Sequence, residues 1–512
     1  MPPTAPHERG SRQGADVNLP DWTTGGFPPL WEVAQRLAAG TVSSEHLVDA
    51  CEAAQRQWHG TINALVLSDF DAARAAARDS DRRRRAGHAR GMLDGVPFSV
   101  KESFDVAGWP TTCGNPALRN QVPGRDAVVV QRLRDAGAIL LGKTNVPLGL
   151  RDWQSYNAIY GTTRNPHDPT RTPGGSSGGS AAAVCAGLSF FDVGSDIGSS
   201  LRNPAHYCGI FSLKPSHALV PLAGHGTGDA RFGEQDINVA GPLARSARDL
   251  EPVLRVIAGP DGDDALPYRL QWPECPHRRL ADFRIAVLPT HAQAEADREV
   301  AAQIEQLGHW LAEQGAHVGW HERPDFDPGE LWHAYVTLLR ATTSVHMDDA
   351  AFADALARSA TATAGDHDYA TLQYTGATLR HRDWLRLQVA RERFAAAWRS
   401  FFTRYDVLLC PAAATTAFAL DEAGEPWQRT LTVNGRPQPM TTQLFWAGHS
   451  GLCGLPSAVA PIGPGAGGLP VGVQIVAGRY QDLTALRFAC LLEEAGYAYR
   501  PPVPPQSAAD HN

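Results

Sequence analysis

The segment from Asp126 to Asn145, DAVVVQRLRDAGAILLGKTN, restricts the fold more than any other stretch of the sequence. Its first half has the apolar spacing of a helix, a glycine follows, and AILLGKTN is typical of an apolar strand. GVPFSVKESF (95–104) predicts a short buried strand that runs into a loop. FRIAVLP (283–289) and YDVLLCPA (405–412) also predict fully buried strands. Helices and buried strands therefore alternate along the chain, as in an α/β layer fold.

Further segments extend this alternation. LWEVAQRLAAG (30–40) and SSEHLVDACEAAQRQ (43–57) predict helices, and residues 296–400, rich in Ala, Arg and Glu, predict a helical insertion or cap over the sheet. The 512 residues have room for about three average domains, or for one large α/β unit with insertions. The sequence shows no repeat of fixed period, so we do not expect a solenoid. Residues 1–20 and 501–512 are polar or Pro-rich, and we expect them to be mobile tails.

Charge and cysteine content exclude several classes of protein. The formal net charge is −8, and the one basic run, Arg82–Arg85, lies in an Ala-rich helical stretch that is typical of a solvated helix face. We therefore expect no nucleic-acid partner. The eight cysteines form no CxxC pair and no zinc-type spacing, so we expect no metal and mostly core cysteines of a reducing compartment.

The sequence also argues against a membrane partner. The first twenty residues contain no apolar core of a signal peptide. No apolar run approaches the roughly 18 residues that a membrane span needs. A soluble cytoplasmic protein is the expectation.

The stretch Thr172–Ser180, TPGGSSGGS, has the composition of a flexible linker. A linker should continue in polar low-complexity sequence, but this stretch runs directly into AAAVCAGLSFFDVGSD, a small-residue helix followed by an apolar strand. A phosphate-binding loop is a second interpretation, yet the Gly-Lys-Ser/Thr ending and the GxGxxG spacing are both missing. We therefore favour a glycine-lined turn that presents serine hydroxyls at the start of a helix.

A second turn of the same character is GSDIGSSLRNPAHYCG, from Gly194 to Gly209. Small residues surround Ser200, so the backbone amides of Ile197 to Ser200 can point at one small space. Amides gathered in this way stabilise an oxyanion, each donor contributing about 3 to 4 kcal/mol where one has been removed. The two serine turns together predict nucleophilic catalysis.

A serine nucleophile needs a base. No GxSxG elbow accompanies the nineteen histidines. His206 lies close to Ser200 in sequence, but beside Pro204 it is more typical of a packed histidine than of a base. Lys101 follows the apolar run VPFSV at a strand end, and a lysine kept neutral by burial is the alternative base. A strand-end lysine with its ammonium in solvent is the competing interpretation.

Taken together, these segments resemble the amidase signature family of serine hydrolases. The resemblance covers Gly95 to Pro215 in order, resumes near the C-terminus, and is carried by GVPFSVKESFDVAG, PTTCGN, AILLGKTN, YGTTRNP, TPGGSSGGSAAAVCAGL, GSDIGSSLRNPAHYCG, AGPLARSARDLEPVL, YDVLLCPA and GLPSAVAPIGPGAGGLPVGVQIVAG. It implies an α/β fold in which helices flank both faces of a large mixed, twisted sheet, with a helical insertion. It also implies one amidase domain, residues 21–500, with a signature core at about 90–260, the helical block at about 296–400, and C-terminal strands and a helix at about 405–498.

The resemblance assigns a Ser-Ser-Lys triad. Ser200 matches the nucleophile, Ser176 the bridging serine whose preceding peptide bond is cis in the family, and Lys101 the base. It further implies an acyl-enzyme, no cofactor, oxyanion-hole amides and groups that support the triad. The oxyanion-hole residues are Ile197, Gly198, Ser199 and Ser200, the supporting hydroxyls are Ser177 and Ser195, and Leu150 matches a segment that lines the acyl pocket.

Two positions depart from the family pattern. Ser199 stands where the family usually has Gly, and this puts the substrate range in doubt. Glu102 stands where Asp commonly follows the catalytic lysine, a change that we expect to be minor.

The expected activity is hydrolysis of a linear carboxylic amide of small or medium size. Three alternatives stay open: a carbamate or ester hydrolase with the same triad, a subunit of a tRNA-dependent amidotransferase, and a homologue that only binds ligands. The intact Lys101, Ser176 and Ser200 argue against the last of these. A homodimer is also kept open.

Overall fold

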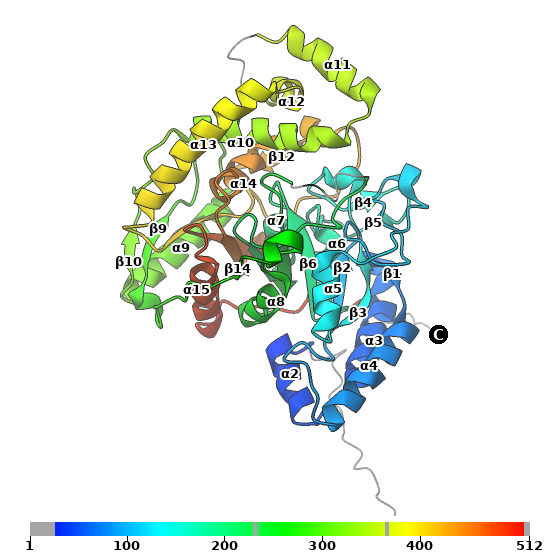
Figure 1. Cartoon of the computed structure of the whole chain (residues 1–512). Coiled ribbons are helices and arrows are strands. Elements are labelled where there is room, and N and C mark those ends of the chain that lie inside the picture. Colours follow the sequence, from blue (N-terminus) through cyan, green and yellow to red (C-terminus); the bar gives the residue numbers. More distant parts are fainter. Residues whose placement is uncertain (1–25, 229–232, 234, 364–367, 506–512) are drawn as a thin grey trace, which may run out of the picture.

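An eleven-stranded sheet runs through the computed structural model of the chain, which describes residues 26–228, 233, 235–363 and 368–505 (Figure 1). In sheet order its strands are β1 (Leu65–Ser68), β3 (Ile139–Thr144), β2 (Pro97–Lys101), β6 (Phe191–Asp196), β8 (Val239–Ala244), β7 (Phe211–Lys214), β14 (Ser457–Pro464), β15 (Pro470–Ala477), β11 (Val407–Pro411), β9 (Arg284–Val287) and β10 (His317–Gly319). Two short hairpins lie outside it, β4 (Tyr156–Asn157) with β5 (Gly161–Thr162), and β12 (Thr430–Val433) with β13 (Arg436–Pro439).

The sheet is mixed. β3, β2 and β6 run parallel to one another, as do β11, β9 and β10, whereas the strands between these two groups pair antiparallel. The five strands expected from the sequence are confirmed as β2, β3, β6, β9 and β11. The mixed α/β fold with a large mixed sheet is therefore confirmed as well.

Helices cover both faces of the sheet (Figure 1). Their bounds are α2 (Leu30–Ala38), α3 (Ser44–Ile62), α4 (Phe70–Arg85), α5 (Val128–Asp135), α6 (Gly178–Cys185), α7 (Arg202–Cys208), α8 (Leu250–Ile257), α9 (Arg298–Glu313), α10 (Pro328–Thr343), α11 (Asp349–Ala360), α12 (Tyr369–Ala377), α13 (His381–Phe401), α14 (Gln443–Gly451) and α15 (Asp482–Glu494). α5, α8, α9 and α15 share one hydrophobic cluster on one face. α6 and α7 form a separate cluster on the other face.

Strand β11 shows how one strand serves both layers. Val407 and Leu409 belong to the cluster formed with α9 and α15, whereas Leu408 and Cys410 belong to the cluster formed with α10, α13 and α14. Successive side chains of a strand point to opposite faces of its sheet. A strand buried on both faces therefore has the continuous apolar sequence that predicted it.

The segment expected to form a helical block divides into two parts. α9 packs on the sheet, and β10 adds the edge strand beside β9. α10, α11, α12 and α13 lie together away from that layer, and Figure 1 shows them at the top of the view. We call these four helices the cap.

Several smaller expectations can be compared with the structure. The cysteines are all unpaired, and every one except Cys490 is buried. Arg82–Arg85 form the last turn of α4, where basic residues interact favourably with the helix dipole. In the described residues, no helix combines the length and the apolar character needed to cross a membrane. The predicted tail 1–20, and residues 506–512 of the other, lie outside the described residues.

Candidate active site

Two parallel strands and two helix N-termini meet at one edge of the sheet. β2 ends at Lys101, and its parallel neighbour β6 ends at Asp196 one residue after Ser195. Parallel strands bring their carboxyl ends to the same edge of a sheet. The chain enters α6 just after Ser176, and it enters α7 just after Ser200. The fold therefore brings together side chains that lie up to 99 positions apart, since 200 minus 101 is 99.

Lys101, Ser176 and Ser200 form a continuous chain of contacts. Lys101 Nζ lies 2.7 Å from Ser176 Oγ, and Ser176 Oγ lies 3.1 Å from Ser200 Oγ. The exposed fractions are 0% for Lys101, 2% for Ser176 and 6% for Ser200. The Gly175–Ser176 peptide bond is cis. This arrangement allows protons to move between the nucleophile candidate and the amine through one hydroxyl.

Burial changes the acidity of the lysine. Removal from water lowers the pKa of Lys101 to about 7, against the opposing influence of Cys113, Asp196 and Asp192. A lysine with this pKa is substantially neutral near pH 7, and a neutral amine can accept a proton. The solvent-exposed alternative for this side chain is wrong, because the side chain is fully buried.

Ser177 and Ser195 connect the two turns. Ser177 Oγ donates to Ser195 O at 3.1 Å, and the Ser177 amide donates to Ser200 O at 3.3 Å. Ser195 Oγ accepts from Lys101 Nζ at 2.9 Å. A Cβ on Gly194 would lie 2.8 Å from Ser177 Oγ, so only glycine allows these turns to approach so closely.

A buried ion pair holds the turn that carries Ser200. Arg202 and Asp196 are both fully buried, and their closest charged atoms lie 2.8 Å apart. Asp196 also accepts the amide of Ser199 at 2.9 Å and that of Leu201 at 3.0 Å. The proposed oxyanion-hole amide of Ser199 is thus already engaged within the protein. Ser199 adopts φ +78°, in the left-handed region that favours glycine.

The carbonyls of the same turn are held from outside it. Trp153 Nε1 donates to Gly198 O at 2.9 Å, and the hydroxyl of Tyr335 on α10 donates to Ile197 O at 2.5 Å. Because both carbonyl oxygens accept hydrogen bonds from other side chains of the protein, the orientation of these two peptide groups is fixed. The cap therefore contacts the turn that carries Ser200 directly through α10.

Asn203 and His225 were not anticipated from the sequence. Asn203 Nδ2 donates to Gly175 O and to Ser199 O, each at 2.7 Å, so one side chain joins both turns. His225 Nε2 lies 2.8 Å from Ser195 Oγ. Asn203 lies in the signature segment, between Arg202 and Pro204, so its position there was the available signal. Nothing adjacent to His225 in the sequence indicates its contact with Ser195.

His206 is a packed histidine, as preferred from the sequence. It is fully buried, and its ring nitrogens lie 3.0 Å from Gly472 O and from Thr415 O. Leu150 is half-buried in the short 3-10 helix Leu148–Leu150, three residues before Trp153. The structure thus places Leu150 in a segment that reaches the turn carrying Ser200, and its role in substrate binding stays a prediction.

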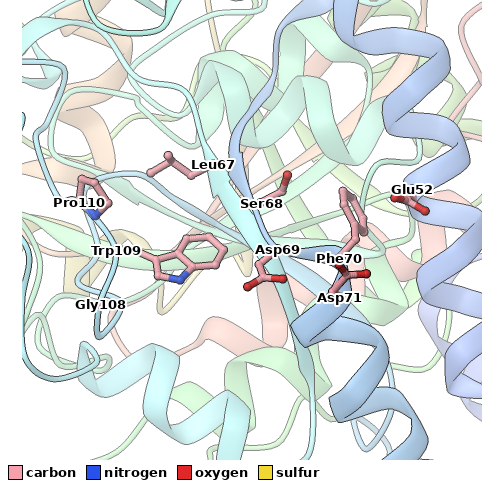
Figure 2. A pocket seen from close by; sticks show the side chains of 9 residues that line it. All are labelled: Glu52, Leu67, Ser68, Asp69, Phe70, Asp71, Gly108, Trp109 and Pro110. Carbon is pink, nitrogen blue, oxygen red and sulfur yellow. The ribbon is translucent and has the colours of Figure 1, made fainter.

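A surface pocket of about 490 Å³ lies elsewhere, between the start of α4 and the loop at Trp109 (Figure 2). Its acidic side chains already have partners: Glu52 and Asp71 pair with Arg74, and Asp69 accepts the amide of Ala72 at the start of α4. Its lining does not include Lys101, Ser176 or Ser200. Among the residues that the structure describes, no group of three His, Cys, Asp or Glu side chains could hold a metal ion.

The chain is similar to known proteins over most of its length. The family model described as Amidase matches residues 46–486. The indoleacetamide hydrolase of Bradyrhizobium diazoefficiens is 30% identical over 477 residues, covering 91% of this chain and 87% of that protein. A glutamyl-tRNA(Gln) amidotransferase subunit from Synechococcus sp. is 31% identical, covering 91% of this chain and 96% of that protein.

The solved structures include similar folds. A bacterial aryl acylamidase of the amidase signature family superposes with a TM-score of 0.76 at 25% identity, covering 92% of this chain and 96% of that one. The likeness therefore extends over nearly the whole chain rather than over the serine turns alone.

Proposed function

From the premise that this chain belongs to the amidase signature family, whose enzymes act on amide carbon–nitrogen bonds, we propose that it hydrolyses a linear carboxylic amide through Lys101, Ser176 and Ser200. The observation that carries the proposal is the unbroken contact chain, 2.7 Å from Lys101 to Ser176 and 3.1 Å from Ser176 to Ser200. The serine and lysine roles are proposals of their own, beyond family membership.

Acylation follows from the order of these contacts. Ser200 Oγ attacks the amide carbonyl carbon, its proton passes to Ser176, and the Ser176 proton passes to the neutral amine of Lys101. Only rotation of hydroxyl groups is needed, since hydrogen positions on serine adjust to their partners. The tetrahedral intermediate then expels the amine, which takes its proton back through Ser176. An ester to Ser200 and a free amine or ammonia result.

Deacylation repeats the same steps with water. Water attacks the ester carbon, its proton moves through Ser176 to Lys101, and the Ser200 alkoxide recovers a proton as the carboxylic acid leaves. The amides of Ile197, Gly198 and Ser200 are assigned to the oxyanion, because the Ser199 amide donates to Asp196. Donors that are fixed before the reaction stabilise developing charge without reorganisation.

A matched set of substrates tests the proposal. An amide, an ester and a carbamate with the same acyl group should be compared with Ser200→Ala as the blank. Ser212→Ala is a matched control, because Ser212 is also a buried serine and its hydroxyl has no hydrogen-bond partner among the described residues. We expect Ser212→Ala to keep amide turnover and Ser200→Ala to lose it. Turnover of the ester or carbamate without the amide would contradict the proposal.

A role in a protein complex is the second candidate. It is favoured by the 31% identity to the amidotransferase subunit over most of both chains. Co-purification of a partner subunit together with glutamine-dependent product formation would support it. A single species on a sizing column with amidase activity would support the free-standing enzyme, and the same experiment measures whether it is a homodimer.

A further inference from the structure

The hydroxyl of Ser195 contacts two nitrogen bases at once. Its Oγ accepts from Lys101 Nζ at 2.9 Å, and His225 Nε2 lies 2.8 Å from the same oxygen. All three side chains are buried, with exposed fractions of 3% for Ser195, 0% for Lys101 and 2% for His225. Among the described residues, the Ser195 hydroxyl has no other hydrogen-bond partner. Because buried hydroxyls donate their protons to a partner, this proton goes to one of the two nitrogens.

The backbone holds His225 beside the strand that carries the lysine. Residues 103–105, shortly after Lys101, run beside residues 224–226, and two backbone hydrogen bonds of 2.8 Å join the two segments. Phe104 and His225 form an isolated antiparallel bridge, and the centres of their rings lie 4.7 Å apart. The position of the imidazole relative to the amine is therefore fixed by backbone and ring contacts as well as by Ser195.

A neutral lysine can face its two serine neighbours in two ways. Its amine has two N–H groups and one lone pair, and Nζ lies 2.7 Å from Ser176 Oγ and 2.9 Å from Ser195 Oγ. In one arrangement the lone pair faces Ser176 and can accept its proton, while an N–H donates to Ser195. In the reverse arrangement the lone pair faces Ser195, and Ser176 has no acceptor. The direction in which Ser195 donates its own proton selects between them.

The tautomer of His225 decides that direction. Burial, and then the charge of Lys101, lower the pKa of His225 to about 3, so the ring is neutral at working pH and carries one proton, on Nδ1 or on Nε2. A protonated Nε2 would donate to Ser195, and the Ser195 proton would then go to the lysine lone pair. An unprotonated Nε2 accepts the Ser195 proton instead, and the Ser195 oxygen then offers the amine only an acceptor.

We propose that His225 is a positioning residue for Lys101, whose unprotonated Nε2 accepts the Ser195 proton and so directs the lysine lone pair to Ser176. This rests on the proposed hydrolysis through Lys101, Ser176 and Ser200, and names a further residue for that reaction. The same contact serves the protonated state, because the Lys101 ammonium donates to the Ser195 oxygen that His225 keeps as an acceptor.

The tautomer can be measured without any substrate. The full-length protein is labelled with nitrogen-15 histidine, and the His225 signals are assigned by their absence in His225→Gln. A ring nitrogen that carries a proton and one that carries a lone pair have well separated nitrogen-15 chemical shifts. We expect Nε2 of His225 to be unprotonated between about pH 6 and pH 9. A proton on Nε2 in this range would overturn the proposal.

Kinetics of three variants measure the effect on the rate. We expect His225→Phe to lower kcat by about 10- to 100-fold with little change in KM, because part of the lysine population then presents an N–H to Ser176. His225→Gln, whose side-chain oxygen also accepts, should recover part of the rate. Ser195→Ala should cost a similar factor, and combining it with His225→Phe should lose no more than the larger single loss, since the two residues act as one unit.

His449→Phe is the matched control. His449 is also a buried histidine among aromatic rings, and burial lowers its pKa to about 4. Its Nδ1 lies 2.9 Å from Phe445 O within α14, so the ring bonds to its own helix. We expect this variant to keep the wild-type kcat and pH profile.

The pH–rate profile distinguishes positioning from packing. In His225→Phe the Ser195 hydroxyl can donate to the lysine lone pair, which favours the neutral amine over the ammonium. The pKa of Lys101 should therefore fall, and the acid limb of kcat/KM, expected near pH 7 in the wild type, should move to lower pH. The other titratable groups that act on this pair are Cys113, Asp196, Asp192 and His346. The substitution removes none of them, so the shift reports on the contact with Ser195.

Labelling of Ser200 separates this inference from the proposed function. A small fluorophosphonate forms a bond from Ser200 Oγ to phosphorus and releases fluoride, and the serine proton leaves through Ser176 to Lys101. We expect the labelling rate to fall about 10- to 100-fold in His225→Phe and to recover in part in His225→Gln. This result without amide hydrolysis would mean that only the proposed function fails.

A merely structural histidine would give a different result. Wild-type amide turnover and labelling in folded His225→Phe would overturn the inference and leave the proposed function standing. Additive losses in the double variant, no recovery by glutamine, or an unmoved pH profile would also overturn it. Thermal unfolding of each variant distinguishes loss of position from loss of fold, and the tautomer of the wild-type ring decides the question if a variant does not fold.

Discussion

The two serine turns and the outer helices of the cap differ in how much of their surface is buried. From Thr172 to Gly209 every residue is buried except the half-buried Ile197. In the cap, α11 buries only Ala355 and α13 buries three residues of its 21. Small residues and internal hydrogen bonds fix the turns, whereas the cap presents charged faces to water. The difference teaches that dense packing of a few local segments fixes the serine turns, whereas the outer helices of the cap are held by far fewer buried side chains.

Replacing the proposed base should have the largest effect. We expect Lys101→Ala to lower kcat by at least about 10³-fold, because no other group within reach of Ser176 can accept its proton. Steady-state kinetics measure the loss, and circular dichroism checks that the fold is kept. Near-normal turnover by a folded variant would remove Lys101 from the mechanism and weaken the contrast between turns and cap.

Breaking the buried ion pair should cause the largest loss of stability. Asp196→Ala leaves the Arg202 charge buried and takes the acceptor from two backbone amides. We expect the free energy of unfolding to fall by about 3 to 5 kcal/mol. Denaturant unfolding of the variant beside wild type measures this. If the free energy of unfolding falls no more than it does when an exposed ion pair is removed, the buried pair does not stabilise the turn as we expect.

The pH dependence follows from the lowered pKa of Lys101. Activity requires the neutral amine, so the rate should be lost as pH falls through about 7 and reach a plateau above it. Below that value, kcat/KM should drop by about tenfold for each pH unit. A profile of kcat/KM from pH 5 to 9 checks this. A flat profile would mean that no titrating lysine controls the reaction.

Replacing Ser199 inside the buried turn should have a smaller effect on stability. Its φ of +78° is unfavourable for a residue with a Cβ, and its hydroxyl makes one long contact of 3.4 Å to Ala412 O. We expect Ser199→Gly to raise the free energy of unfolding by up to about 1 kcal/mol. Ser212→Gly, in strand β7, is the matched control and should lower it. Destabilisation by both substitutions would show that the serine hydroxyl outweighs the backbone cost.

The smallest effect is expected on the cap surface. Asp383 contacts Arg380 at 3.0 Å and Arg386 at 3.1 Å, but all these side chains are accessible to solvent. Exposed pairs contribute little because water and salt screen them. Asp383→Ala should therefore leave the thermal unfolding midpoint unchanged. A clear drop would show that the cap depends on surface charge more than its architecture indicates.

Sequence patterns predicted more of the fold than of the site. Apolar runs identified β2, β3, β6, β9 and β11, because strands buried on both faces have a distinctive composition. The same patterns did not separate α9 from the cap, since both are helical and only packing distinguishes them. The two serine turns and Lys101 were selected from the sequence, and the structure brings them into contact.

Local sequence patterns did not predict the side chains that surround the two serine turns and Lys101. Tyr335 donates to a carbonyl 138 positions away, and His225 contacts a serine 30 positions away. Such contacts depend on how segments far apart in the chain pack together, which no short stretch specifies.

By itself the sequence determined the α/β fold class, the family and the local backbone of the serine turns, because glycines, small residues and apolar runs act over a few positions. Only the tertiary structure decided that Lys101 is fully buried and that Ser195 contacts both Lys101 and His225. Burial and charge pairing depend on every segment that surrounds a side chain, and those segments are far apart in the chain.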